Sequence, residues 1–132
     1  MKTYRLSLIC LLSGALATLP SCAAPPLAKD QCSEAADERA MLACREGEFA
    51  AVTSLLGSAV EKLQQRFRDD TPKRSRFLAA AQEAWLHYRD AECRVQTYDS
   101  RGGAAFRVYE LDCLTGLTRD RLDAIQRLLA TP

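Results

Sequence analysis

Cysteine is the residue type in this chain with the clearest chemistry. Cys10 and Cys22 lie in an apolar N-terminal stretch, and the remaining four of the six cysteines are Cys32, Cys44, Cys93 and Cys113. An even number of cysteines favours disulfides in an exported chain. No Cys-x-x-Cys occurs and only one histidine is present, which argues against zinc, haem and thioredoxin-type sites. We expect two disulfides and no metal or other cofactor.

The pairing of the four cysteines is open on spacing alone, because four cysteines allow three connectivities. Cys32–Cys44 and Cys93–Cys113 are favoured because each pair brackets a candidate turn. A bridge requires Cα atoms within about 7 Å, whereas twelve residues of uninterrupted helix span about 18 Å. The chain near Cys32 is therefore predicted to fold back along the helix that carries Cys44.

A second group of chemically notable residues lies between positions 82 and 93. Gln82, Trp85 and Arg89 share one helix face, and Cys93 extends that face by a turn. A guanidinium on a core-facing strip must be paired, and helix-end carbonyls, Asp112 or a carboxylate of the preceding helix are the expected acceptors. We interpret this cluster as structural rather than catalytic. Its predicted members are Gln82, Trp85, Arg89, Asp90 and Arg121.

Catalytic chemistry is not predicted. His87 lies off the face of Trp85 and Arg89, and no serine or cysteine is visibly paired with it. Glu83, Asp90 and Glu92 follow one another on an arginine-rich helix, where such carboxylates usually form solvated ion pairs. A glycosidase would need two carboxyl groups facing each other across a cleft, and a small helical domain offers little cleft. No catalytic residues are assigned.

The elements that position these residues are all expected to be helices, because apolar residues recur at helical spacing after residue 32. Ser33 is the predicted cap of the first helix, and Thr71 with Pro72 is predicted to begin a later one. Residues 100–103 should form a turn around paired glycines. The predicted helices cover residues 34 to about 45–47, 48–68, 72 to about 98, 104–114, and from about 117 or 118 onwards.

The fold class predicted from this pattern is all-α, a small antiparallel helical bundle stapled by two disulfides. Helix 48–68 should bury Phe49, Val52, Leu55, Leu56, Ala59, Val60, Leu63 and Phe67. Helix 72–98 should bury Phe77, Ala81, Ala84, Tyr88, Ala91 and Val95, with Leu78 and Trp85 beside this stripe.

The N-terminus has the features of an export signal over residues 1–22. Lys2 and Arg5 precede an apolar run that is too short for a comfortable membrane span, and small residues follow it. Leu-Pro-Ser-Cys at residues 19–22 resembles a bacterial lipobox, which would make Cys22 a lipidation site. The alternative is cleavage after Ala23 and release into the periplasm. Residues 23–31 would form a tether, and residues 32–132 the folded domain.

The charge balance excludes some partners. The 132 residues contain 18 Lys and Arg against 17 Asp and Glu, a net charge of +1 that becomes −1 once Lys2 and Arg5 are removed. Such a chain has no field that would attract nucleic acid or an anionic membrane. We expect a protein partner in the periplasm, no nucleic acid, and membrane contact only through a lipid anchor.

The chain resembles the lysozyme inhibitor LprI-type domain family over roughly residues 30–130. The resemblance rests on the run Q-x-x-W-x-x-x-R-D-x-x-C at 82–93, on Gly102-Gly103, on Cys113, on Thr118-x-x-Arg121-Leu122 and on the upstream Cys32 and Cys44. It implies a small exported helical domain, in a family named after inhibition of lysozyme by a lipoprotein member.

The resemblance also implies a form that inhibition would take. A protein inhibitor must plug the carbohydrate groove of lysozyme, which holds acidic catalytic side chains, and a loop held by a disulfide would do so at a low ordering cost. The candidate interface loop is Asp99, Ser100, Arg101, Gly102 and Gly103, in which Arg101 would pair with a carboxylate of the target. A second exposed candidate is the connection of residues 69–76, which carries Lys73, Arg74 and Arg76. The alternative function is an envelope structural or interaction lipoprotein without a lysozyme target.

Overall fold

The chain folds into three long helices. The computed structural model describes residues 32–70 and 72–131, so the predicted signal, Cys22, the tether and the cap Thr71 lie outside the described residues. The helices are α1 (Glu38–Asp70), α2 (Pro72–Gln96) and α3 (Phe106–Ala130), with a 3₁₀ turn η1 (Tyr98–Ser100) after α2. The described part of the chain contains no strand, and the all-α prediction is confirmed.

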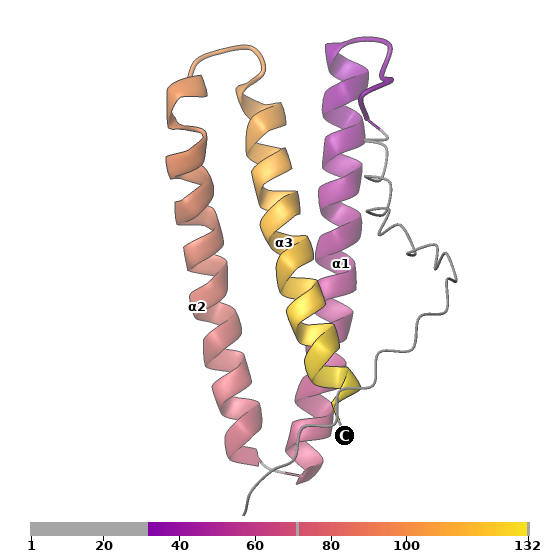
Figure 1. Cartoon of the computed structure of the whole chain (residues 1–132), viewed down its shortest axis with the longest axis vertical. Helices are drawn as coiled ribbons and strands as arrows, with labels where there is room; N and C mark the ends of the chain where they lie inside the picture. The colour runs from indigo at the N-terminus through magenta and orange to yellow at the C-terminus, as the bar shows by residue number, and fades with distance from the viewer. Residues whose placement is uncertain (1–31, 71, 132) are drawn as a thin grey trace, which may run out of the picture.

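The bundle consists of two parallel helices and one antiparallel helix. In Figure 1, α1 and α3 run downwards side by side. Helix α2, which comes between them in the sequence, runs upwards. The connection at residue 71 joins α1 to α2 at the lower end, and η1 with the following loop joins α2 to α3 at the upper end. Within the described ranges, no helix combines the length and the apolar character that crossing a membrane requires.

Helix α1 is one continuous element of 33 residues, so the predicted break near residues 45–47 is wrong. Gly47 weakens a helix interior by roughly 1 kcal/mol relative to alanine, yet the ion pair of Arg45 with Glu48, 3.0 Å long, spans it. The start of the helix is also later than predicted. Asp37, not Ser33, precedes the first helical residue, and its Oδ1 accepts the Ala40 N–H at 2.8 Å as an N-terminal cap.

Helix α3 is likewise continuous, so the predicted break between residues 114 and 117 is wrong. Gly116 lies on the exposed side of the helix, where a Cβ would meet nothing within 4 Å. The glycine therefore marks neither a turn nor a close approach. The opposite side of α3 is buried and holds the helix in place through Leu111, Thr115, Thr118, Leu122 and Ile125.

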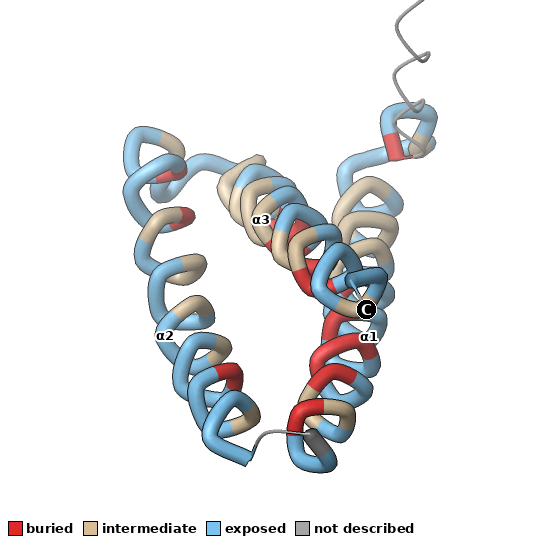
Figure 2. The backbone as a smooth tube through the Cα atoms, turned by 60° about the horizontal axis from the view of Figure 1, so that its bottom comes forward, coloured by how far each residue is buried: buried red, intermediate tan, exposed pale blue. Residues whose placement is uncertain are grey.

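The hydrophobic core lies mainly between α1 and α3. Figure 2 shows buried positions on the facing sides of these two helices and few on α2. Trp85 and Phe49 pack against the core, but Leu55 is 60% exposed, which corrects its predicted burial. The core consists of Val52, Leu56, Ala59, Val60, Leu63 and Phe67 from α1, Leu78 from α2, and Leu122 and Ile125 from α3.

One end of this core is closed by a side-chain cap. Arg66 Nη1 donates to the Leu129 carbonyl at 3.0 Å, and Arg66 Nη2 donates to the Thr131 carbonyl at 2.6 Å. These carbonyls belong to the C-terminal end of α3, where backbone acceptors lack partners within the helix and cations are favoured. Arg66 thus fixes the end of α3 against α1.

Two buried threonines of α3 offer a matched stability test. Thr118 Oγ1 donates to the Leu114 carbonyl at 2.6 Å, whereas Thr115 Oγ1 is buried and has no hydrogen-bond partner among the described residues. A buried hydroxyl without a partner costs about 1–3 kcal/mol. We expect Thr115→Val to raise the free energy of unfolding by about 1 kcal/mol, measured by urea unfolding. Thr118→Val should not raise it, and equal effects of both substitutions would contradict this account.

Helix α2 presents a different face to the core from the one predicted. Leu78 and Cys93 are its buried residues, and Gln82, Trp85, Arg89 and Glu92 are half-buried. The six predicted core residues of α2, from Phe77 to Val95, are instead all exposed. The reason is rotational: the disulfide at Cys93 turns its own side of the helix toward α3, about a quarter turn away from the predicted stripe.

Candidate functional site

The loop between α2 and α3 is the predicted interface loop, and it is built from consecutive tight turns. The buried Thr97 ends α2, where its hydroxyl donates to the Cys93 carbonyl at 2.7 Å. The Arg101 N–H donates to the Tyr98 carbonyl at 3.3 Å, and the Gly103 N–H to the Ser100 carbonyl at 3.1 Å.

A glycine and a chain of backbone hydrogen bonds define the path of this loop. Gly102 adopts φ of 80°, a conformation that a side chain disfavours, and thereby confirms the predicted glycine turn. The Phe106 N–H then donates to the Gly103 carbonyl at 3.2 Å, directly before α3 begins. The loop is thus specified by its own backbone.

Both favoured disulfides form. Cys93 and Cys113 connect α2 to α3 just below the loop, with Cα atoms 5.7 Å apart. Cys32 and Cys44 are also 5.7 Å apart. Since Cys32 is buried and lies in a turn before α1, the N-terminal segment folds back along the helix as predicted.

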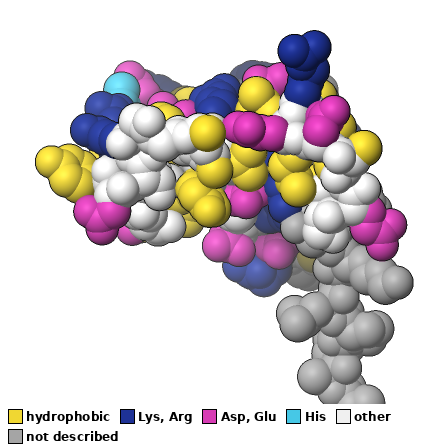
Figure 3. All heavy atoms as spheres, turned by 90° about the horizontal axis from the view of Figure 1, so that it is seen from above, with side chains coloured by type: hydrophobic (Ala, Val, Ile, Leu, Met, Phe, Trp, Pro, Cys, Tyr) yellow, Lys and Arg dark blue, Asp and Glu magenta, His cyan; other side chains and the backbone are white. Residues whose placement is uncertain are grey.

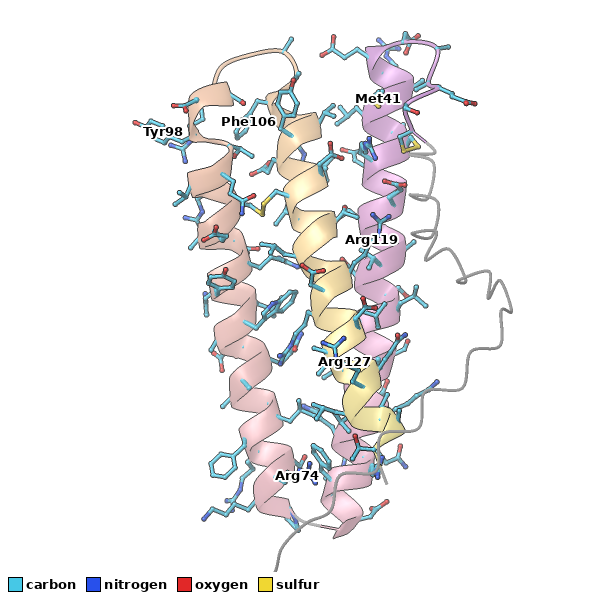
Figure 4. The ribbon with its side chains drawn as sticks, in the orientation of Figure 1. Met41, Arg74, Tyr98, Phe106, Arg119 and Arg127 are labelled. Atoms are coloured by element: carbon cyan, nitrogen blue, oxygen red, sulfur yellow. A yellow bond between two sulfur atoms is a disulfide. The ribbon has the colours of Figure 1, made fainter. Side chains whose placement is uncertain are left out.

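The tip of the loop exposes one cation beside an aromatic ring. Asp99, Arg101, Gly102 and Gly103 are exposed, and Ser100 is half-buried. The Arg101 guanidinium carbon lies 5.1 Å from the centre of the Tyr98 ring, within cation–π range. In Figure 4 the Tyr98 side chain points away from the bundle. Arg101 therefore presents a charge to solvent on an aromatic support.

The surface around this tip is mixed in character. Figure 3 looks onto the upper end of the bundle and shows basic, acidic and hydrophobic side chains interspersed. Arg107 and Glu110, in the first turns of α3, form an ion pair of 2.7 Å. Because both signs of charge are mixed here, this end of the bundle does not attract a charged partner over a long distance. Recognition at this end would depend on contact geometry.

The predicted structural cluster comes together between the helices. The Arg89 guanidinium carbon lies 5.4 Å from the Trp85 ring centre and 5.5 Å from that of Phe49 in α1. Arg121 of α3 lies 5.8 Å from the Trp85 ring centre, and its Nε donates to Gln82 Oε1 at 3.1 Å. Burial lowers the pKa of Arg121. One tryptophan thus links all three helices through two guanidinium groups.

The partner of Arg89 differs from the acceptors expected from the sequence. Its Nη2 lies 2.7 Å from Oδ1 of Asp90, the next residue in the chain, and its Nε donates to the same oxygen at 2.8 Å. Asp112, one of the expected acceptors, instead pairs with Arg45. The Arg89 guanidinium is therefore paired with a carboxylate of its own helix. Its contribution to the contacts between helices is its stacking on Trp85 and Phe49.

A polar link between α1 and α3 was not predicted from the sequence. Arg45 Nε lies 2.9 Å from Asp112 Oδ1, while its Nη1 contacts Glu48 at 3.0 Å. Arg119, which Figure 4 shows between α3 and α1, lies 3.7 Å from Glu48. The sequence contains one usable signal, the i,i+3 spacing of Arg45 and Glu48. The link to Asp112 depends on the parallel register of α1 and α3.

Beside this cluster lies an open hollow of about 350 Å³, lined by Phe49, Arg89, Asp90, Cys93, Arg94, Arg107, Glu110 and Leu114. Its acidic residues already pair with its arginines. His87, the single histidine, is exposed on α2. Among the residues that the structure describes, no group of three or more histidine, cysteine or acidic side chains is arranged to hold a metal ion.

Comparison with known proteins agrees with this architecture. A crystal structure of a DUF1311 family protein from Pseudomonas putida KT2440 superimposes with a TM-score of 0.64 at 25% identity, covering 74% of this chain and 98% of the other. An uncharacterized protein of Rhizobium meliloti (strain 1021) is 27% identical over 128 residues, 87% of this chain and 92% of its own length. The family described as Lysozyme inhibitor LprI matches residues 29–125. The chain therefore belongs to the lysozyme inhibitor LprI family.

Proposed function

We propose that the protein is an exported, protein-binding inhibitor domain that blocks lysozyme by inserting the loop of residues 99–103 into the carbohydrate groove. The observation that carries the proposal is the placement of Arg101, which is exposed at the tip of a loop fixed by tight turns and the Cys93–Cys113 bridge. The name of the matching family supports lysozyme as the target.

Loop insertion suits this geometry energetically. Binding normally costs free energy because flexible interface side chains and loops must be ordered. A loop whose ends are joined by a disulfide and whose backbone is hydrogen-bonded to itself has little left to order. Arg101 could then form a charge-assisted pair with a carboxylate in the groove, where water is largely excluded.

Export and anchoring are part of the proposal and rest on the sequence. Residues 1–22 would direct the chain out of the cytoplasm, and lipidation of Cys22 would hold it at a membrane in the periplasm. The two disulfides, Cys32–Cys44 and Cys93–Cys113, are typical of proteins in an oxidising compartment. Mass spectrometry of the mature N-terminus tests this step: a diacylated Cys22 supports anchoring, and an unmodified N-terminus at Ala24 contradicts it.

The function itself is tested by a lysis assay. The purified, oxidised protein should slow the lysis of bacterial cell walls by lysozyme in a dose-dependent manner. Several types of lysozyme should be compared, since the groove differs among them. No slowing at a large molar excess over every type would overturn the proposal and favour a structural or interaction role in the envelope.

Substitution of Arg101 locates the binding site. We expect Arg101→Ala to weaken inhibition at least tenfold, because one charge-assisted contact is lost, without lowering the melting temperature of this exposed position. Arg68→Ala is the matched control, an exposed arginine at the other end of the bundle. Full potency of Arg101→Ala would place the contact surface elsewhere.

A further inference from the structure

The exposed side of α2 carries a continuous apolar stripe. Its residues are separated alternately by four and three positions, and the whole stripe is exposed, with Phe77, Tyr88 and Val95 at 64%, 55% and 72% of their full exposure. We call these residues the α2 stripe: Phe77, Ala81, Ala84, Tyr88, Ala91 and Val95.

This spacing is that of a helix–helix seam. Apolar residues that alternate by four and three positions keep to one side of a helix and pack into the holes of a partner helix. The α2 stripe extends over roughly 27 Å at a rise of 1.5 Å per residue. Since α1 and α3 contact the side of α2 that carries Leu78 and Cys93, neither of them covers the stripe. An apolar surface of this regularity indicates an interaction site.

The stripe is self-complementary in one orientation. Its spacing reads the same in both directions from the midpoint between Ala84 and Tyr88, so a second copy can lie antiparallel on it about a two-fold axis. That arrangement sets Tyr88 against Ala84 of the other copy, Ala81 against Ala91, and Phe77 against Val95. A two-fold interface requires this reciprocity, in which each contact occurs twice.

The parallel orientation fits less well. It would set each aromatic ring against its own copy, Phe77 on Phe77 and Tyr88 on Tyr88, which holds the helices apart. Each of Ala81, Ala84 and Ala91 would then face the same alanine of the other copy across a gap. Such a gap leaves the small side chains without packing contacts. The antiparallel orientation sets alanine against alanine only at Ala81 and Ala91. It seats each Tyr88 over Ala84 of the other copy, so that the two tyrosine rings do not meet.

The charges of α2 permit this antiparallel contact. Glu83 and Asp90 lie on a helix edge away from the stripe, whereas Glu92 flanks the stripe on the edge that also carries Leu78, and it would lie beside Leu78 of the other copy. On the opposite flank, Arg94 would lie beside Ala80 of the other copy. The contact therefore brings no carboxylate against a carboxylate and no arginine against an arginine.

We propose that the α2 stripe is a homodimer interface in which α2 packs antiparallel on α2 of a second copy. One pair of helices of this length buries less than the ~800 Å² per partner of a standard interface. The dimer should therefore dissociate on dilution. This proposal does not rest on lysozyme binding, because the stripe lies along the helix and the loop of residues 99–103 lies at its end.

Sedimentation equilibrium of the purified, oxidised protein tests the proposal. The mass should double between low and high micromolar concentration. Ala84→Glu, at the centre of the stripe, should weaken the dimer at least tenfold. Ala79→Glu makes the same substitution at an exposed position of α2 about half a turn away and should leave the dimer unchanged. Circular dichroism should show the same helix content and melting temperature for all variants.

A charge pair then tests the orientation. Ala81→Glu alone should weaken the dimer, and the double variant Ala81→Lys with Ala91→Glu should restore it, because each lysine would face a glutamate of the other copy. In a parallel pair, like charges would meet and the double variant would stay monomeric. A monomeric parent protein at high concentration, a dimer insensitive to Ala84→Glu, or failure of the double variant to dimerise would each overturn the proposal.

Discussion

Replacing Leu63 by alanine should lower the free energy of unfolding by about 3 kcal/mol, measured by urea unfolding. Leu63 is 0% exposed and belongs to the core between α1 and α3. Truncation of a buried leucine to alanine costs 2–5 kcal/mol, because transfer free energy is lost and a cavity remains. In a bundle with two long parallel helices, surrounding backbone cannot easily move in to fill that cavity.

Leu55→Ala provides the matched control for Leu63→Ala. It is the same substitution on the same helix, at a residue that is 60% exposed. A surface substitution of this kind changes stability by about 0.5 kcal/mol or less. The dependence of stability on urea concentration should be equal in both variants, since the surface exposed on unfolding barely changes. Similar losses at the two positions would contradict the assignment of the core to the α1–α3 contact.

The core of α1 could be predicted from its sequence because one apolar stripe dominates that helix. The residues from Val52 to Phe67 follow one face, and the structure buries all of the predicted members except Leu55 and the half-buried Phe49. Helix breaks were harder to place. Gly47 and Gly116 lie in or beside the two predicted breaks, but an exposed glycine in a helix costs only about 1 kcal/mol, and the packed sides of α1 and α3 outweigh that cost.

The rotation of α2 could not be read from periodicity alone. Two sets of residues on this helix have helical spacing, the stripe from Phe77 to Val95 and the set formed by Leu78, Trp85 and Cys93. The first set is more apolar, so the sequence favoured it. A disulfide is a stricter constraint than apolarity, because it requires the Cα atoms of Cys93 and Cys113 within about 7 Å. The bridge therefore orients Cys93 toward α3 and leaves the stripe in solvent.

Short-range features of the candidate site were accessible from the sequence, and long-range pairings were not. The turn at Gly102 and the shared face of Gln82, Trp85 and Arg89 follow from local spacing. The contacts of Arg45 with Asp112 and of Arg66 with the end of α3 join residues more than sixty positions apart. Such pairs depend on the register of α1 against α3, which no local pattern specifies.

Removing the bridge between α2 and α3 should affect both stability and inhibition. Cys93 and Cys113 are separated by 20 residues, and a loop of that length stabilises by about 3 kcal/mol through the entropy of the unfolded chain. We expect the double variant Cys93→Ala with Cys113→Ala to lose about that amount in urea unfolding. Inhibition of lysozyme should also weaken, because the loop of residues 99–103 would have to be ordered on binding.

The variant Cys32→Ala with Cys44→Ala separates these two effects. Its bridge closes 12 residues, so the chain-entropy account gives a similar loss of about 3 kcal/mol. This bridge, however, fastens the segment before α1 and encloses no part of the loop of residues 99–103. Under conditions in which both variants remain folded, only the loss of Cys93–Cys113 should weaken inhibition. If the two variants inhibit lysozyme equally well, the Cys93–Cys113 bridge does not position the loop of residues 99–103 for binding.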